Sequence, residues 1–213
     1  MDQVLDVVLI LILALNFYAL GVSRIRGIVN AVALQGVLLG IVPLLAHGSH
    51  GLRGVLLLIV TVGLKGVAIP RLILYAMREA KIQHEVKPII SPMNSLFLAG
   101  VGTGLALALS STLPLADQHA GRLIVPASLS TVWNGFLLMT ARRKAITQVL
   151  GYLVLENGIF LFGVLLLEAM PLLVELGVLL DVFTGVFVMG IIVHQINREF
   201  ATISTEHLAE LKE

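Results

Sequence analysis

Three ionisable side chains, Glu156, Asp181 and Lys65, lie within otherwise apolar stretches of this sequence. On insertion scales, a charged residue at the centre of a membrane span costs about 2.5–3.5 kcal/mol, so such residues usually mark a site or an ion pathway. A buried carboxyl group can take up and release a proton as nearby charges change. The three residues therefore predict a pathway for protons or ions through the membrane.

The two acids are expected at different depths. At 1.5 Å per helical residue, Glu156 lies about 20 Å from Arg143 at one interface, and Asp181 lies about 9 Å from Glu175 at the other. Acids staggered in this way on neighbouring antiparallel helices could pass a proton in steps. The alternative is structural, because a protonated Glu156 could form a hydrogen bond that ties helices together.

Three further residues could extend this pathway. Thr184 lies about one turn from Asp181, although its hydroxyl could instead bond to a carbonyl of its own helix. Glu175 could guard an exit at the outer turn, or it could simply be solvated. His194 lies near the opposite end of that span and could carry protons near neutral pH, or serve only as an interfacial residue.

Lys65 is expected deep within a span, and Pro70 follows it on the same helix. Proline leaves a carbonyl without its helical partner near Gly66, which predicts a kink or a break beside the ammonium. An isolated charge in a low-dielectric region is very costly. We hypothesise that Lys65 faces a polar seam and pairs with a carboxylate, for which Glu156 is the best candidate in this chain. The alternative is that Lys65 snorkels to an interface.

Composition places these residues in a polytopic membrane protein. Hydrophobic residues make up 58% of the chain, charged residues 13%, and the mean hydropathy is +1.00. The absence of cysteine excludes disulfides, thiolate metal sites and cysteine-ligated iron–sulfur clusters. His47 and His50 form a His-x-x-His pair without a third ligand, so we predict no metal site in this chain.

At about 20 apolar residues per crossing, the sequence predicts an all-α integral membrane fold with seven transmembrane helices. A single transmembrane domain is expected over residues 1–197, followed by a cytoplasmic tail over residues 198–213. The expected spans are 4–22, 27–46, 54–77, 93–115, 123–141, 145–167 and 174–196.

The seven spans are predicted to contain a duplication. With an offset of 118 residues (134 − 16), Asn16 aligns with Asn134 and Arg24 aligns with Arg142. Spans 1–3 and 5–7 would then be two parallel three-helix repeats joined by span 4. The corresponding segments are a degenerate repeat at 1–80, a connecting span at 81–120 and a second repeat at 121–197.

The two copies differ in charge. Glu156 aligns with Leu38 at this offset and, after a five-residue gap, Asp181 aligns with Leu58, so the first copy lacks both acids. Lys65 lies nearly two turns beyond Leu58, which is the helix face that Asp181 occupies in the second copy. The duplication therefore keeps a polar face and reverses its charge.

Small residues at helical spacing predict where helices approach one another closely. Two pairs have the small-xxx-small spacing, Gly36 with Gly40 and Gly100 with Gly104. Both are predictions about packing and carry no functional content.

The basic residues are distributed unevenly between the two sides of the predicted bundle. One side collects eleven lysines and arginines, whereas the other has Arg53 and Arg122. The positive-inside rule therefore places the N-terminus outside and the C-terminus in the cytoplasm. The eleven residues are Arg24, Arg26, Arg71, Arg78, Lys81, Lys87, Arg142, Arg143, Lys144, Arg198 and Lys212.

Four parts of the chain carry a resemblance to a known family. They are Gln148–Gly158, Leu173–Gly177 followed by Asp181, Lys65 with its following proline, and Leu208–Lys212. These segments resemble the E component of hydrogenase-4-type (Hyf) group 4 membrane nickel–iron hydrogenases, and the resemblance covers essentially the whole chain. More distantly, spans 5–7 resemble the K component of complex I and the C component of Mrp antiporters, in which each of the last two helices carries an acid. Glu156 occupies the position of the first acid, and Asp181 replaces the glutamate that is usual at the second.

The resemblance implies a non-redox membrane subunit of a complex-I-like, formate hydrogenlyase-type complex in a bacterial or archaeal cytoplasmic (inner) membrane. The implied partners are antiporter-like membrane subunits, a membrane subunit like the H component of complex I, membrane lipids and a peripheral nickel–iron hydrogenase arm, with no nucleic acid. This chain would have no catalytic centre or cofactor of its own. The nickel–iron centre and the iron–sulfur clusters would belong to partner subunits of the oxidoreductase.

Two other functions stay open at this point. A stand-alone secondary ion transporter would also carry repeats and charges at mid-membrane depth. A purely structural scaffold subunit could simply bridge larger subunits. Ion flux through the purified chain alone would distinguish the transporter, and substitutions that remove charge within the complex would distinguish the scaffold.

The charge distribution makes a testable prediction about topology. Single cysteines can be introduced and labelled in intact cells, because the native chain contains none. We expect a cysteine at Lys144 to be protected from an impermeant thiol reagent, and cysteines in the segment 47–53 to react. Labelling of position 144 from outside would overturn the predicted orientation.

Overall fold

The protein is described by a computed structural model that covers residues 2–47, 52–79, 88–113, 123–165, 177, 180, 182–187 and 189–190. This part of the chain is helical and contains no β-strand. Its main elements are α1 (Asp2–Gly21), α2 (Ile25–His47), α3 (Leu52–Thr61), the π-helix η1 (Val62–Ala68), α4 (Ile69–Glu79), α5 (Pro92–Ser110), α6 (Ile124–Ala141) and α7 (Ala145–Leu165).

Six stretches of helix in the described part of the chain are long and apolar enough to cross a membrane. They match the first six predicted spans, so the all-α membrane class is confirmed. The predicted seventh span, 174–196, falls mostly outside the described residues, although those described within it are helical. The tail at 198–213 lies outside them entirely, so the domain boundary stays a prediction.

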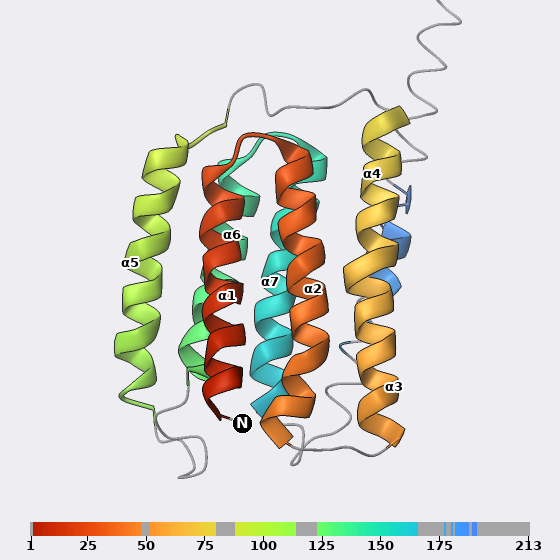
Figure 1. Cartoon of the computed structure of the whole chain (residues 1–213). Helices are drawn as coiled ribbons and strands as arrows, with labels where there is room; N and C mark the ends of the chain where they lie inside the picture. The colour runs from red at the N-terminus through yellow and green to blue at the C-terminus, as the bar shows by residue number, and fades with distance from the viewer. Residues whose placement is uncertain are drawn as a thin grey trace, which may run out of the picture.

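Two antiparallel helix pairs lie side by side at the centre of the bundle (Figure 1). One pair is α1 with α2 and the other is α6 with α7, with α1 against α6 and α2 against α7. On one side α5 contacts α1 and α6, and on the other side the rod formed by α3, η1 and α4 contacts α2. The two pairs correspond to the first two spans of each predicted repeat. The duplication itself stays a prediction, because most of the last span is not described.

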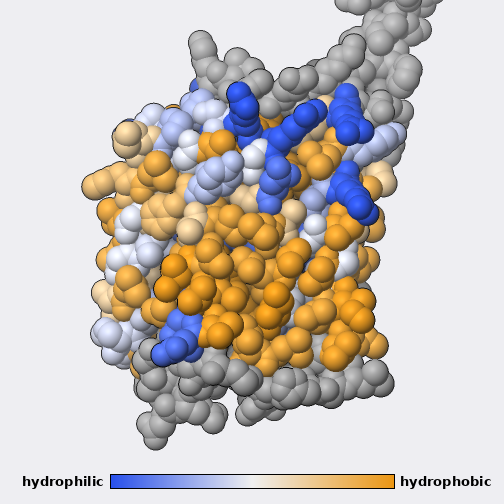
Figure 2. Space-filling model, viewed as in Figure 1, coloured by the Kyte–Doolittle hydropathy of each residue, from blue (hydrophilic) through white to orange (hydrophobic). Residues whose placement is uncertain are grey.

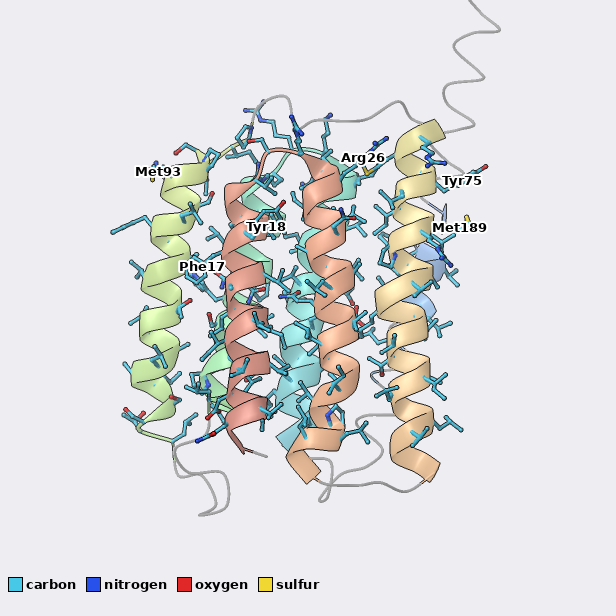
Figure 3. All side chains as sticks on the ribbon, in the orientation of Figure 1. Phe17, Tyr18, Arg26, Tyr75, Met93 and Met189 are labelled. Atoms are coloured by element: carbon cyan, nitrogen blue, oxygen red, sulfur yellow. The ribbon has the colours of Figure 1, made fainter. Side chains whose placement is uncertain are left out.

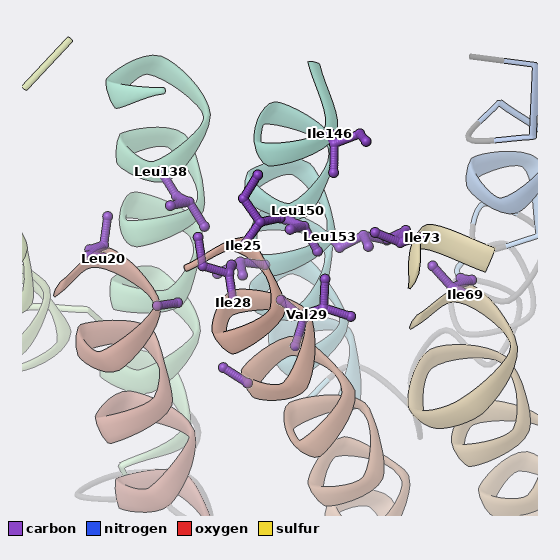
Figure 4. Close-up of a cluster of buried hydrophobic side chains, with 14 of the residues drawn as sticks. Leu20, Ile25, Ile28, Val29, Ile69, Ile73, Leu138, Ile146, Leu150 and Leu153 are labelled. Atoms are coloured by element: carbon purple, nitrogen blue, oxygen red, sulfur yellow. The ribbon is translucent and has the colours of Figure 1, made fainter. Parts of the chain in front are cut away.

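Apolar side chains fill the two ends of this bundle. Near the α1–α2 and α6–α7 turns, a cluster includes Leu20, Ile25, Leu138 and Leu150 (Figure 4). Towards the other end, a second cluster is formed by residues from the same four helices, including Leu5, Leu9, Leu39, Ile124 and Leu161. On each of these four helices, buried polar residues lie between the two clusters: Asn16 on α1, Gln35 on α2, Thr131 and Asn134 on α6, and Glu156 and Asn157 on α7. The core is therefore a polar layer between two apolar ones.

Two glycines of α2 allow the η1 rod to approach closely. A Cβ at Gly36 would lie 2.6 Å from the carbonyl carbon of Lys65, and a Cβ at Gly40 would lie 2.6 Å from Cγ2 of Val62. The close packing predicted for Gly36 and Gly40 is therefore confirmed. It holds the backbone that carries Lys65 directly against α2.

The same prediction was wrong for Gly100 and Gly104, which meet no other described side chain or helix. They lie on the outward face of α5. The glycine of α5 that packs closely is Gly102, which contacts the ring of Trp133. Trp133 also donates a hydrogen bond from Nε1 to the Leu98 carbonyl at 3.0 Å. Spacing identified a small-residue face but not its direction.

The segment before Pro70 is wound as a π-helix, where a kink or break was predicted. The N–H of Ile69 donates to the carbonyl of Leu64, five residues back, and Pro70 has no N–H to continue an α-helical pattern. The rod from α3 through α4 thus stays continuous (Figure 1). The irregularity predicted beside Lys65 is present, but as a wider turn.

Basic side chains gather at the end of the bundle that holds the two tight turns. Figure 2 shows hydrophilic residues at this end above a broad hydrophobic surface, and Figure 3 places Arg26 there. Arg142 lies at the same end but is buried, with only 1% of the residue exposed. Its Nη2 donates to the carbonyls of Leu20 at 2.9 Å and Val22 at 3.3 Å, which satisfies the C-terminal end of α1. Which side of the membrane this end faces stays a prediction.

The glycine contacts predict different outcomes for two matched substitutions. Gly36→Ala should destabilise the protein by about 1–3 kcal/mol, because the new methyl group meets backbone that cannot move aside cheaply. Gly100→Ala is the control and should be neutral or stabilising by up to about 1 kcal/mol, through higher helix propensity alone. Thermal unfolding in detergent, followed by fluorescence of the single tryptophan, measures both. Equal stability of the two variants would contradict the assigned packing.

Candidate functional site

The polar layer contains a buried pair of opposite charges. Lys65, on η1, is 5% exposed, and Glu156, on α7, is 3% exposed. The Lys65 Nζ lies 3.7 Å from Oε1 of Glu156. The same ammonium donates a hydrogen bond to Oδ1 of Asn157 at 3.2 Å and lies 5.4 Å from the centre of the Phe160 ring. The structure thus brings together the two residues that were expected to pair.

Helical spacing explains why α7 can supply all three contacts. Residues 156, 157 and 160 lie on one side of the helix, because residue 160 is four positions from 156 and three from 157, and both spacings bring side chains together. On α2, Gly36 lets the backbone of η1 approach closely. The ammonium is therefore held among a carboxylate, an amide oxygen and an aromatic ring, which are the three groups that attract a buried cation.

The energetics of this pair depend strongly on both partners being present. At an effective dielectric constant of about 20, two unit charges at this distance attract by about 4 kcal/mol before the cost of desolvation. Burial removes much of that gain, so such a pair adds little net stability. Removing one partner, however, leaves a buried charge without its counter-charge and is strongly destabilising.

The other predicted pathway residues are only partly covered by the structure. Asp181, Glu175 and His194 lie outside the described residues, so the expected stagger of the acids stays a prediction. Thr184 is described and is 3% exposed. Its Oγ1 donates to the Leu180 carbonyl at 2.9 Å, which is the local alternative considered for this residue.

A chain of buried neutral side chains was missed by the sequence reasoning. Asn157 donates from Nδ2 to Oε1 of Gln35 at 3.2 Å, and Gln35 donates from Nε2 to Oδ1 of Asn16 at 2.6 Å. Asn16 in turn donates from Nδ2 to Oγ1 of Thr131 at 2.9 Å. Amides within apolar spans could have revealed it, because such side chains commonly bond across membrane helices. The chain links Lys65 to α7, α2, α1 and α6.

A second, smaller polar group connects α6 with α5. Asn134 donates from Nδ2 to Oγ of Ser130 at 3.3 Å, and Ser130 shares a 2.7 Å hydrogen bond with Thr103. These two hydrogen bonds involve no member of the chain that runs from Lys65 to Thr131. The group orients α5 and gives the bundle a buried amide that is separate from the charged pair.

The site holds one carboxyl group and one ammonium group among neutral amides. Of these, a carboxylate is the group that can accept a proton, because an ammonium has donors only and amides are not titratable near neutral pH. Among the described residues, no group of three or more histidine, cysteine, aspartate or glutamate side chains could hold a metal ion. The His47–His50 pair lies outside the described side chains.

A cavity of about 580 Å³ opens nearer the basic end of the bundle. Thr140, Gln148, Tyr152 and Thr184 contribute polar groups to it, and Met139, Val149 and Phe187 are among its apolar lining. Lys65 and Glu156 are not among the lining residues. Thr184 therefore borders this cavity.

Comparisons with known proteins find relatives over most of the chain. The chain is 34% identical over 194 residues to "Uncharacterized protein Rv0085" of Mycobacterium tuberculosis, an alignment that covers 89% of this chain and 87% of that protein. It is 26% identical over 148 residues to "Hydrogenase-4 component E" of Escherichia coli K12 and of Shigella flexneri, covering 70% of this chain and 68% of those proteins. No family model and no solved structure matches the chain.

The charged pair predicts strongly non-additive effects on stability. Lys65→Met and Glu156→Leu should each destabilise the protein by about 3–5 kcal/mol, because each leaves the partner charge in the polar layer without its counter-charge. The double variant should cost clearly less than the sum of the two. Unfolding of the four proteins in one detergent completes the cycle. Additive losses would show that the two side chains do not interact.

Proposed function

The chain belongs to the same protein family as Rv0085 of Mycobacterium tuberculosis, and we propose that it is a non-redox membrane subunit of a hydrogenase-type complex. Two observations support this. The distant relatives over 70% of the chain are named as a component of hydrogenase-4, and six stretches of helix in the described part are suited to a membrane. The resemblance in Gln148–Gly158, which contains Glu156, points the same way.

The buried pair of Lys65 and Glu156 is the observation that carries the mechanistic part of the proposal. Both residues lie at the middle of membrane-spanning helices, between two apolar clusters. An ion pair contributes little stability at that depth, so stability alone gives weak reason to keep it there. Intramembrane ionisable residues most often belong to ion and proton pathways. We therefore assign the pair to a charge pathway through the complex.

In the proposed mechanism, the pair changes its charge as a unit. A proton that reaches Glu156 neutralises the carboxylate and removes the counter-charge from Lys65. The ammonium then favours another acceptor or anion, on this chain or on a neighbouring subunit. Its positive charge changes the electrostatic potential at that group. Release of the proton from Glu156 restores the attraction. Asp181, Glu175 and His194 would extend this path towards the two membrane surfaces, while Thr184 borders it.

The proposal includes an assembly and an orientation. The membrane neighbours would be antiporter-like subunits and a subunit like the H component of complex I, and spans 5–7 would take the place of the K component. The peripheral arm would carry the nickel–iron centre and the iron–sulfur clusters, since this chain has no cysteine. The basic end of the bundle would face the cytoplasm, as the positive-inside rule requires.

Replacement of the acid tests the proposal in the assembled complex. Glu156→Gln removes the titratable group but keeps a side-chain oxygen that can accept from the Lys65 ammonium, so it should destabilise less than Glu156→Leu and the complex should assemble. Proton translocation per hydrogen produced should fall by about 10²-fold. Inverted membrane vesicles with a fluorescent pH indicator report translocation, and gas analysis reports hydrogen. Arg24→Gln is the control, because it also removes one charge, but from an exposed position.

Two outcomes would count against the proposed role. Normal coupling in the Glu156→Gln complex would make this acid a structural residue. Loss of assembly in Glu156→Gln, with normal assembly in Arg24→Gln, would favour the scaffold alternative.

A further inference from the structure

The hydrogen bonds that start at Lys65 all run in the same direction. The ammonium donates to Asn157, Asn157 donates to Gln35, Gln35 donates to Asn16, and Asn16 donates to Thr131. Thr131 ends the series by donating from Oγ1 to the carbonyl of Ala127 at 2.7 Å. The amide oxygens of Asn157, Gln35 and Asn16 therefore point back along this series of hydrogen bonds towards the Lys65 ammonium, and their NH2 groups point away from it.

This direction follows from the chemistry of lysine. An ammonium has three donors and no acceptor, so only the oxygen of Asn157 can face it favourably. The NH2 of Asn157 must then face Gln35, which has to present its own oxygen. The same reasoning passes to Asn16 and then to Thr131. Reversing the amide of Asn157 or Gln35 alone would bring donor against donor on one side and acceptor against acceptor on the other, in a layer where a lost hydrogen bond is costly.

Gln35 is the best-fixed member of the chain. Its Nε2 is held by two acceptors, Oδ1 of Asn16 at 2.6 Å and the carbonyl of Ile12 at 3.2 Å. Its side chain is buried, with 1% of the residue exposed. Because both acceptors lie on α1, the oxygen of Gln35 is left to face Asn157 on α7. The hydrogen bonds that fix Gln35 to α1 thus hold the Asn157 amide in the same orientation that the ammonium favours.

We propose that Gln35 is a positioning residue, which holds the Asn157 amide with its oxygen towards Lys65 and so keeps the ammonium at Glu156. The Lys65 Nζ lies 3.2 Å from Oδ1 of Asn157 and 3.7 Å from Oε1 of Glu156, so the amide oxygen is the nearer of these two atoms. Without Gln35, the NH2 of Asn157 loses its acceptor and the amide is free to turn. Its oxygen then no longer holds Lys65 beside the carboxylate.

The proposal concerns the ion pair itself, and only its consequence for translocation rests on the proposed function. Neutral amides do not carry the proton, so Gln35 acts on the pathway through position and field alone. A role in packing alone is the competing explanation, since a buried side chain of this size also fills space between α1, α2 and α7. The two explanations differ in what they predict for the distance between Lys65 and Glu156 when Gln35 is replaced by a side chain of similar volume.

That distance can be measured by solid-state NMR on the full chain in lipid bilayers. Lysine is labelled with ¹⁵N at Nζ and glutamate with ¹³C at Cδ, and dipolar recoupling detects pairs in close contact. The signal that disappears in Lys65→Met belongs to the pair. Gln35→Met keeps the length of the side chain but removes both ends of the hydrogen-bonding amide. Asn134→Leu is the matched control, because it removes a buried amide that bonds to Ser130 instead.

We expect Gln35→Met to lose the recoupling signal assigned to Lys65 and Glu156, and Asn134→Leu to keep it. A signal of wild-type size in Gln35→Met would overturn the proposal, and so would equal loss in both variants. If Gln35→Met fails to fold, Gln35→Asn provides the test. It keeps the amide but is one methylene shorter, so it cannot reach α1 and Asn157 together, and the signal should again be lost. Retention of the signal in Gln35→Asn would overturn the proposal as well.

Because the measurement needs no hydrogenase, it separates this inference from the proposed function. Loss of the signal in Gln35→Met, together with normal translocation in Glu156→Gln, would support the positioning role and contradict the proposed function. Retention of the signal in Gln35→Met, together with impaired translocation in Glu156→Gln, would contradict the positioning role and support the proposed function.

Discussion

The contact between Lys65 and Glu156 imposes requirements on every helix around it. A buried ammonium needs an anion and further acceptors within reach. Helix α7 supplies the carboxylate of Glu156, the amide oxygen of Asn157 and the ring of Phe160. The η1 backbone must come close to α2, which Gly36 permits because it has no side chain. The π-helical turn before Pro70 is part of the same arrangement, since such turns often occur at functional positions in helices.

The rest of the bundle isolates this polar layer from both membrane surfaces. Apolar clusters lie above and below it, so the charges are held in a region of low dielectric where their interactions are strong. The tight turns at one end are fixed by Arg142, whose guanidinium donates to the last carbonyls of α1. This bond joins the two central helix pairs at their ends, while the chain from Lys65 to Thr131 joins them at their middle. Neutral amides thus connect a charged site to helices that carry no charge of their own in that layer.

How much the sequence could predict depended on how unusual each residue is within an apolar span. Charged residues are rare there, so Lys65 and Glu156 stood out and their pairing could be expected. Asn157, Gln35 and Asn16 were not predicted as a site, because neutral amides within a span are less unusual than charges. Their hydrogen bonds also depend on how four helices are arranged, which the sequence does not give. Gly36 and Gly100 have equal spacing to a second glycine, yet among the described residues Gly36 faces a neighbouring helix and Gly100 does not. Spacing alone therefore does not reveal which face is buried. Pro70 indicated an irregular turn, but the surrounding packing determined that it is a continuous π-helix. Asp181, Glu175 and His194 stay predictions, because they lie outside the described residues.

The central claim is that this buried pair serves a membrane subunit of a hydrogenase-type complex, and the composition of the native assembly tests it most directly. Native membranes would be solubilised gently, the complex isolated through a tag on this chain, and its subunits and metal content determined by mass spectrometry. We expect a nickel-containing hydrogenase subunit and antiporter-like membrane subunits to be recovered with this chain in fixed proportions. Recovery of the chain alone, or in a stable assembly that contains no nickel–iron subunit, would contradict it.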